Sequence, residues 1–154
     1  MVDVNVTVQR EPFDGAKEYE VLTSSGHAAA AVFSGFVRDF GHSGDVAVLE
    51  LEHYPEMTER VLSEIGAAAV DRFDLLNWRI IHRYGALNAR EPIVWVGVTA
   101  QHRANAFAAC EFIMDYLKTK APFWKKEISA EGHSLWVNAL EQDTERQQRW
   151  EETN

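Results

Sequence analysis

The stretch Asp115-Tyr-Leu-Lys-Thr-Lys-Ala-Pro-Phe-Trp-Lys-Lys-Glu127 marks the change from a helix to a strand and organises the fold around it. Apolar residues upstream recur at helical spacing, and they are Phe107, Cys110, Met114 and Leu117. Pro122 cannot continue that helix, so the chain should leave it as an extended segment. Lys118 on the last helical turn and Lys125 on the outgoing strand are then expected to converge. Taken alone, these lysines also fit a solvated helix end that complements the helix dipole.

The composition is that of one globular domain, which we expect to span residues 1–154. Hydrophobic residues make up 46% of the chain and charged residues 25%, and the formal net charge is −9. This acidity argues against general binding to nucleic acid or to an anionic membrane, so a local cluster of lysines is a more specific signal. Cys110 is the single cysteine, which excludes an intrachain disulfide and fits a reducing cytoplasm. The N-terminus does not read as a signal peptide, and no apolar run is long enough to span a bilayer.

The periodicity predicts strands and helices in alternation along the chain. A first strand carries Val2, Val4, Val6 and Val8, and further strands are expected at Ala28–Val37, Val46–His53, Trp78–His82, Ile93–Thr99, Phe123–Ile128 and Leu135–Val137. Helices are expected at Thr58–Phe73 and Arg103–Lys118, with a charged helix or tail from about 141 to 154 whose face is solvated. The order predicts an α+β fold with a mixed, largely antiparallel sheet and two main helices packed on it.

Two further positions suggest an anion site. Thr99 to Arg103 lies where a buried strand gives way to a helix, and free N–H groups at a helix start attract anions. His102 and Arg103 add side-chain donors there. Arg38 ends a strand just before a Gly-containing loop, which is a frequent functional position. The alternative interpretation is that Arg38, His102 and Arg103 are ordinary charged or polar residues on the surface.

Several motifs that define other enzyme classes are missing from the sequence. No Cys-x-x-Cys, His-Glu-x-x-His or clustered His and carboxylates indicates a metal site, and no Gly-rich nucleotide loop or Gly-x-Ser-x-Gly elbow occurs. His53 and His82 lie in strand patterns and are expected in the core or at a pocket edge. The Lys, Arg and His residues that remain suit an anionic substrate whose negative charge develops at a carbonyl or phosphate.

The same regions carry a resemblance to a known family. The matching motifs are Ser34–Arg38, Leu51–Pro55 with Met57–Glu59, Ile81–Gly85, Val96–Thr99 with His102–Arg103, and Phe112–Glu127. Together they resemble the large, catalytic subunit of molybdopterin synthase. The resemblance runs from about Ala28 to Val137, which is nearly the whole chain.

The resemblance implies a hammerhead-type α/β fold and a specific activity. Members of this family convert a cyclic pyranopterin monophosphate to molybdopterin, the dithiolene ligand of the molybdenum cofactor. Sulfur arrives as a thiocarboxylate on the C-terminal Gly-Gly tail of a separate small ubiquitin-like subunit, so no redox cofactor or metal is implied. The implied assembly is a homodimer of large subunits that carries one small subunit at each outer end, a heterotetramer.

The resemblance also implies a set of site residues. Lys118 and Lys125 match the catalytic lysines, and the two also bind substrate. The other implied substrate contacts are Phe36, Val37, Arg38, His102, Arg103, Lys126 and Glu127, drawn from one chain or from both chains of a dimer. Phe36 stands where well-known members carry a basic residue, which leaves only a backbone contact there. The role of Lys118 stays open between oxyanion stabiliser and general acid or base, because close ammonium groups lower each other's pKa.

Two other classes of function remain open at this point. One is a non-catalytic partner that docks a ubiquitin-like carrier, for which loss of Lys118 or Arg103 would be the mark. The other is a nucleic-acid module in which Phe123 and Trp124 stack on bases. In the synthase interpretation the same two aromatics line the groove for the carrier's tail, with core packing as their alternative role.

Overall fold

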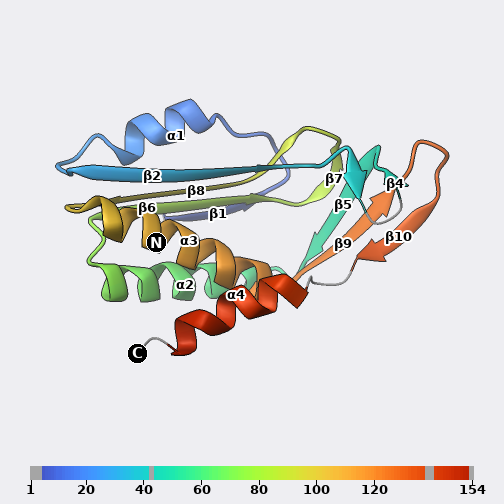
Figure 1. The fold of residues 1–154 in the computed structure, drawn as a ribbon. Coiled ribbons are helices and arrows are strands. Elements are labelled where there is room, and N and C mark those ends of the chain that lie inside the picture. The colour runs from blue at the N-terminus through green and yellow to red at the C-terminus, as the bar shows by residue number, and fades with distance from the viewer. Residues whose placement is uncertain (1–4, 42–43, 138–140, 153–154) are drawn as a thin grey trace.

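Two small sheets and the helices around them make up the structure (Figure 1). The computed structural model describes residues 5–41, 44–137 and 141–152. None of the described helices is long and apolar enough to cross a membrane.

The larger layer is a four-stranded sheet in the order β1, β6, β8, β2. Its strands are β1 (Val6–Gln9), β6 (Asn77–Arg83), β8 (Pro92–Ala100) and β2 (Ala29–Phe36). The pair β1–β6 is parallel, and the other two pairs are antiparallel. The strand β8 is buried from Val94 to Ala100, as its continuous apolar run predicts for an inner strand covered on both faces.

Helices cover both faces of this sheet. The helices α2 (Met57–Phe73) and α3 (Arg103–Lys120) pack against one face, and α1 (Gly15–Leu22) lies across the other (Figure 1). The main core fills the space between the sheet and α2 and α3, where side chains such as Leu62, Val96 and Ile113 are fully buried. A smaller cluster of Leu22, Ile81 and Trp95 lies under α1.

The second sheet stands at the end of the molecule where α3 finishes (Figure 1). Its four strands, in spatial order, are β10 (Ser134–Val137), β9 (Phe123–Ile128), β5 (Val48–His53) and β7 (Gly85–Asn88). All its pairs are antiparallel, and the short strands β3 (Phe40–Gly41) and β4 (Gly44–Asp45) form a hairpin beside it. The chain passes from α3 into β9 through Pro122, so the helix end and this sheet are held together covalently.

The predicted α+β class is confirmed, and most predicted elements occur within a few residues of their expected bounds. The strands form two sheets where one was expected, because β5, β7, β9 and β10 pair with each other and not with β8. The sequence interpretation did not include α1 or β7. Val2 and Val4 of the expected first strand lie outside the described residues.

The charged C-terminal helix α4 (Glu141–Glu152) docks on α3, so the prediction of a merely solvated segment was wrong. The indole Nε1 of Trp150 donates to Oδ2 of Asp115 at 2.8 Å, and Arg149 donates to the same oxygen at 3.0 Å. The Trp150 ring also meets Phe73 and Phe112 edge-on. Arg146 and Arg149 also form ion pairs with Glu111 of α3. A single tryptophan among charged residues gives no apolar stripe in the sequence, so this packing has no local signal.

Candidate active site

A cavity of about 630 Å³ opens where α3 ends between the two sheets. Its wall is built by β2, β5, β6, β8, β9, β10 and the ends of α3 and α4. The charged and polar side chains among the lining residues are Ser34, Arg38, His82, Lys118, Lys125, Glu127 and Asp143. The apolar ones include Phe33, Phe36, Ile93, Leu117 and Phe123.

Lys118 and Lys125 converge as the sequence predicts. Lys118 lies on the last turns of α3, Pro122 ends the helical path, and β9 returns past the helix end. Along β9 the side chains alternate, so Phe123, Lys125 and Glu127 all line the cavity. Two elements that are adjacent in the sequence therefore supply both lysines.

Trp124 and Lys126, which lie on the opposite face of β9, do not line the cavity. Lys126 forms an ion pair with Glu50 at 3.7 Å and lies over the ring of Trp136. Trp124 is half exposed. The predicted substrate contact from Lys126 and the predicted groove contact from Trp124 are therefore not brought into this cavity, because the two-residue period of the strand turns both side chains away from it.

The pKa of Lys125 is lowered from 10.5 to about 8. Burial is the main cause, because it removes water from the ammonium group. The charge of Lys118 acts in the same direction, as does a hydrogen bond with Lys118 that favours the neutral amine. Asp143 of α4 opposes these effects, and Arg38 adds to them. The cavity thus holds an amine that exchanges its proton near neutral pH beside a second lysine.

Glu127 and Gly41 lie against each other at the inner wall. The Glu127 side chain is buried, and the backbone of Gly41 passes so close to its carboxylate that a Cβ at Gly41 would require the carboxylate to shift. This contact brings the β3–β4 hairpin to the cavity.

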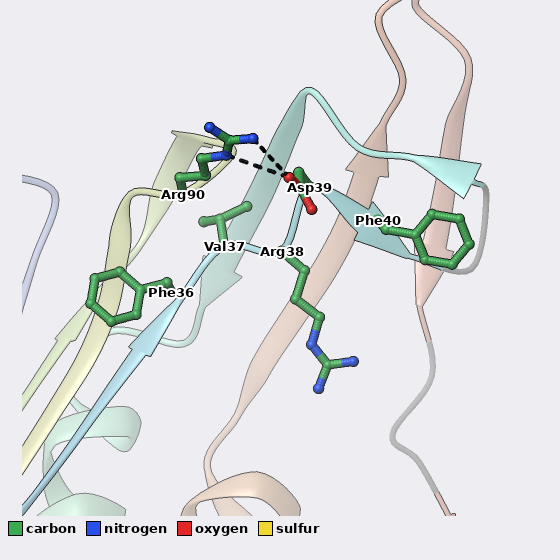
Figure 2. A pocket seen from close by; sticks show the side chains of 6 residues that line it. All are labelled: Phe36, Val37, Arg38, Asp39, Phe40 and Arg90. Atoms are coloured by element: carbon green, nitrogen blue, oxygen red, sulfur yellow. Dashed lines mark hydrogen bonds and ion pairs between the residues drawn. The ribbon is translucent and has the colours of Figure 1, made fainter.

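The segment from Phe36 to Phe40 continues the cavity wall outward. A second, shallower cavity of about 540 Å³ is lined by Phe36, Val37, Arg38, Asp39, Phe40 and Arg90 (Figure 2). Arg90 donates to Asp39 Oδ2 from Nη2 at 3.2 Å, whereas the Arg38 side chain extends away from that pair (Figure 2). Arg38 lines both cavities, so its guanidinium is available to an anion in either. Phe36 is 55% exposed and offers no charge.

His102 and Arg103 do not line either cavity of this chain. Both are exposed at the start of α3, and Lys118 lies near its end. Fifteen residues of helix separate Arg103 from Lys118, which corresponds to roughly 22 Å along the axis. The expected single anion pocket is therefore not assembled within one protomer.

Sequence reasoning missed two cavity residues. Asp143 lies in a highly charged stretch in which no position differs visibly from its neighbours. His82 was assigned only to the core or a pocket edge, although it lines the cavity and is stacked on Phe123. The only feature of the sequence that indicated this place for His82 was its position inside an alternating strand pattern.

Among the described residues there is no group of three or more His, Cys, Asp or Glu side chains that could hold a metal. Cys110 is buried in the core, as predicted, and burial raises the pKa of its thiol to about 11. That thiol is therefore a packing group and not a nucleophile.

Known proteins resemble this chain over nearly its full length. The family model described as MoaE protein matches residues 8–120. A molybdopterin synthase catalytic subunit of Vibrio cholerae serotype O1 is 50% identical over 151 residues, which cover 97% of this chain and 100% of that protein.

Solved structures agree with the sequence matches. A molybdopterin biosynthesis MoaE protein from Burkholderia ambifaria MC40-6 has 43% identity and a TM-score of 0.81, covering 97% of this chain and 99% of that one. A molybdopterin synthase from Staphylococcus aureus has 30% identity and a TM-score of 0.79, covering 86% and 96%. The chain therefore belongs to the MoaE protein family, that of the molybdopterin synthase catalytic subunits, as its motifs predicted.

Proposed function

We propose that this chain is the catalytic subunit of a molybdopterin synthase and transfers sulfur from a small carrier subunit to cyclic pyranopterin monophosphate. The observation that carries the proposal is the contact between Lys118 and Lys125 in a cavity that Arg38 also lines. Three cationic side chains line this cavity against the two carboxylates of Glu127 and Asp143, so in a chain whose net charge is −9 its lining is locally positive and favours an anion.

The reaction sets two electrostatic requirements that these residues meet. Opening the cyclic phosphate and adding sulfur at adjacent carbons needs neutralisation of the phosphate, which Arg38 supplies from the cavity wall. Hydrolysis of the thioester-like link between substrate and carrier forms an oxyanion, which an ammonium group stabilises. Lys118 is assigned to the oxyanion, and Lys125, whose pKa is about 8, is assigned to proton exchange during the same step.

The partner in this proposal is a small ubiquitin-like subunit whose Gly-Gly tail enters the cavity. An extended tail needs a narrow apolar entrance, and Phe36 and Phe123 provide apolar surface in the wall. Phe123 lines the cavity with its ring stacked on His82, whereas Trp124, the other aromatic of the nucleic-acid alternative, does not line it. The two rings therefore do not form one stacking platform, which favours a peptide or pterin in the cavity over the nucleic-acid alternative.

A homodimer would complete the anion site. Arg38, Lys118 and Lys125 form one half within a protomer, and the other half consists of His102 and Arg103 of the partner subunit. The separation of the two ends of α3 supports this arrangement, because a single chain leaves His102 and Arg103 exposed and away from the cavity. The expected assemblies are a dimer alone and a heterotetramer with the carrier.

Reconstitution tests the proposal. The purified chain is mixed with a thiocarboxylated small subunit and the cyclic precursor, and molybdopterin formation is measured. Product that depends on all three components is expected. A chain that binds the carrier without making product would instead favour the non-catalytic docking role.

A further inference from the structure

His82 on β6 lies in the cavity wall and takes no part in the chemistry proposed above. Its side chain is 4% exposed, and its ring is stacked on Phe123 with centroids 3.8 Å apart and planes inclined by 19°. Phe123 is the first residue of β9, two positions before Lys125 on the same face of the strand. The ring plane of His82 is therefore fixed by the strand that carries a proposed catalytic lysine.

One hydrogen bond determines which ring nitrogen carries the proton. Nδ1 of His82 lies 2.8 Å from the backbone oxygen of Arg83. A carbonyl oxygen only accepts, so Nδ1 carries the hydrogen, and in the neutral ring Nε2 is a bare acceptor. The pKa of His82 is lowered to about 3, mainly by burial; the Arg83 bond opposes this, and the charges of Lys125, Lys118 and His53 act in the same direction as burial. The ring is neutral at every physiological pH.

The second ring nitrogen of His82, Nε2, is left to accept a hydrogen bond. Among the described residues it has no hydrogen-bond partner, and none of their fully buried side-chain nitrogens or oxygens lacks one. Nε2 is therefore not sealed in the core, and His82 lines the cavity. The other polar side chains of the described wall are the cations Arg38, Lys118 and Lys125, the carboxylates Glu127 and Asp143, and the hydroxyl of Ser34. Nε2 differs from them because it is uncharged and accepts a hydrogen bond without carrying a hydrogen of its own.

We propose that Nε2 of His82 accepts a hydrogen bond from an N–H group of the ligand in this cavity and so positions the ligand against Lys118 and Lys125. The inference rests on the proposed function and adds a positioning residue to it. Proton transfer is not its role, because the ring stays neutral. Two ligands of that reaction carry suitable donors, the pterin ring system of the precursor and the backbone amides of the carrier's tail.

Two substitutions separate the two nitrogens. His82→Asn places an amide nitrogen near Nδ1, which keeps the donor to Arg83, and removes Nε2. His82→Gln places an amide oxygen near Nε2 and loses the Nδ1 donor. The expected result for His82→Asn is a rise of about tenfold in KM for the precursor or in Kd for the carrier with little change in kcat, and partial recovery in His82→Gln.

His53→Asn is the matched control. His53 belongs to the same aromatic cluster, with its ring 4.4 Å from that of Tyr84 and its Nδ1 3.0 Å from Thr58 Oγ1, but it does not line the cavity. This variant should leave KM and Kd unchanged. A purely structural role for His82 would lower Tm in both of its variants and leave KM and Kd of the folded protein at wild-type values, which would overturn the inference.

Nitrogen NMR of the wild-type protein with labelled histidine gives a readout that needs no variant. Spectra are recorded with the precursor alone and with the small subunit in its carboxylate form alone, neither of which permits turnover. A shift of the Nε2 resonance, smaller than protonation causes, with the precursor assigns the donor to the pterin, and a shift with the carrier assigns it to the tail. No shift with either, from a protein that still makes molybdopterin, would overturn this inference and leave the proposed function intact. A wild-type protein that makes no molybdopterin would overturn both.

Discussion

The two ends of α3 carry basic residues that the sequence suggests belong to one site, yet their surroundings differ. At the C-terminal end, Lys118 meets Lys125 and Arg38 in a cavity walled by both sheets. At the N-terminal end, His102 and Arg103 are exposed, and neither lines a cavity of this chain. In the proposed site, one protomer therefore assembles the half that contains Lys118 and Lys125, whereas its own His102 and Arg103 remain on the surface.

The largest expected effect concerns the cavity end. Lys118→Ala should reduce molybdopterin formation at least about 1000-fold, because the oxyanion loses its nearest cation. Lys120→Ala is the matched control, since Lys120 lies on the same helix end, is exposed and does not line the cavity. Steady-state turnover and carrier binding are measured for both. Near-normal turnover by Lys118→Ala would remove the cavity from the proposed mechanism.

A smaller effect is expected at the other end of the helix. Arg103→Ala should raise KM for the precursor about 10- to 100-fold and leave Tm nearly unchanged, because the residue is exposed and, in the proposed dimer, contacts the phosphate. Titration of the precursor measures the first quantity, and thermal unfolding measures the second. An unchanged KM would exclude the start of α3 from the site.

Mixing the Lys118→Ala and Arg103→Ala proteins tests whether the two ends of α3 meet in one site across a dimer. If each site combines Lys118 of one protomer with Arg103 of the partner subunit, exchange between the two mutant dimers creates one intact site in every mixed dimer. With the precursor kept well below the KM of Arg103→Ala, so that both parent dimers are nearly inactive, roughly a quarter of wild-type activity should then return, since half of the dimers are mixed and each has one intact site of two. No recovery after confirmed exchange would place both residues within a single protomer's site or outside it.

A stability effect is expected where α4 anchors the C-terminal half of α3. Trp150→Ala should lower the free energy of unfolding by about 2 kcal/mol, because it removes the edge contacts with Phe73 and Phe112 and the hydrogen bond to Asp115. Trp124→Ala, at a half-exposed tryptophan, should cost less than about 1 kcal/mol. Denaturant unfolding compares the two, and equal losses would show that α4 is not an anchor.

The smallest effect depends on pH and on Lys125. Its pKa is about 8 in the folded protein against 10.5 for the free side chain, so the unfolded chain binds more protons between these values. Folding is therefore penalised below pH 8, and the penalty disappears as pH rises toward 10.5. Lys125→Met should stabilise the protein on the order of 1 kcal/mol at pH 7, with solvent in the cavity reducing the full effect, and give no gain near pH 10.5. Unfolding across this pH range tests the sign, and a gain that grows with pH would contradict it.

The elements that the sequence predicts are those with strong local patterns. The helix α3 and the strand β9 follow from the spacing of apolar residues before Pro122 and from the effect of Pro122 itself. The helix α1 was missed because Leu22 is its only buried residue, and β7 because Leu87 is the only buried residue of a four-residue strand. Such short segments gain their structure from pairing and packing, which no local pattern records.

The candidate site was predictable only where local sequence patterns determine its geometry. Lys118 and Lys125 lie on consecutive elements, so local geometry brings them together. The division of the strands into two sheets depends on pairing between segments far apart in the sequence, and the place of Asp143 at the cavity depends on the packing of α4 against α3. In the proposed dimer, the place of His102 and Arg103 in the site depends on a second molecule, about which the sequence pattern of one chain holds no direct information.

The most direct test of the central claim follows the carrier's tail. Wild-type protein is mixed with the thiocarboxylated small subunit in a single turnover, with and without the cyclic precursor, and the mass of the small subunit is measured. With precursor, the mass should fall by the difference between sulfur and oxygen as molybdopterin forms. With Lys118→Ala the small subunit should not reach this carboxylate form, because hydrolysis of its thioester-like link to the substrate loses the group that stabilises the oxyanion. Loss of sulfur that needs no precursor, or that proceeds equally well in Lys118→Ala, would contradict sulfur transfer at this cavity.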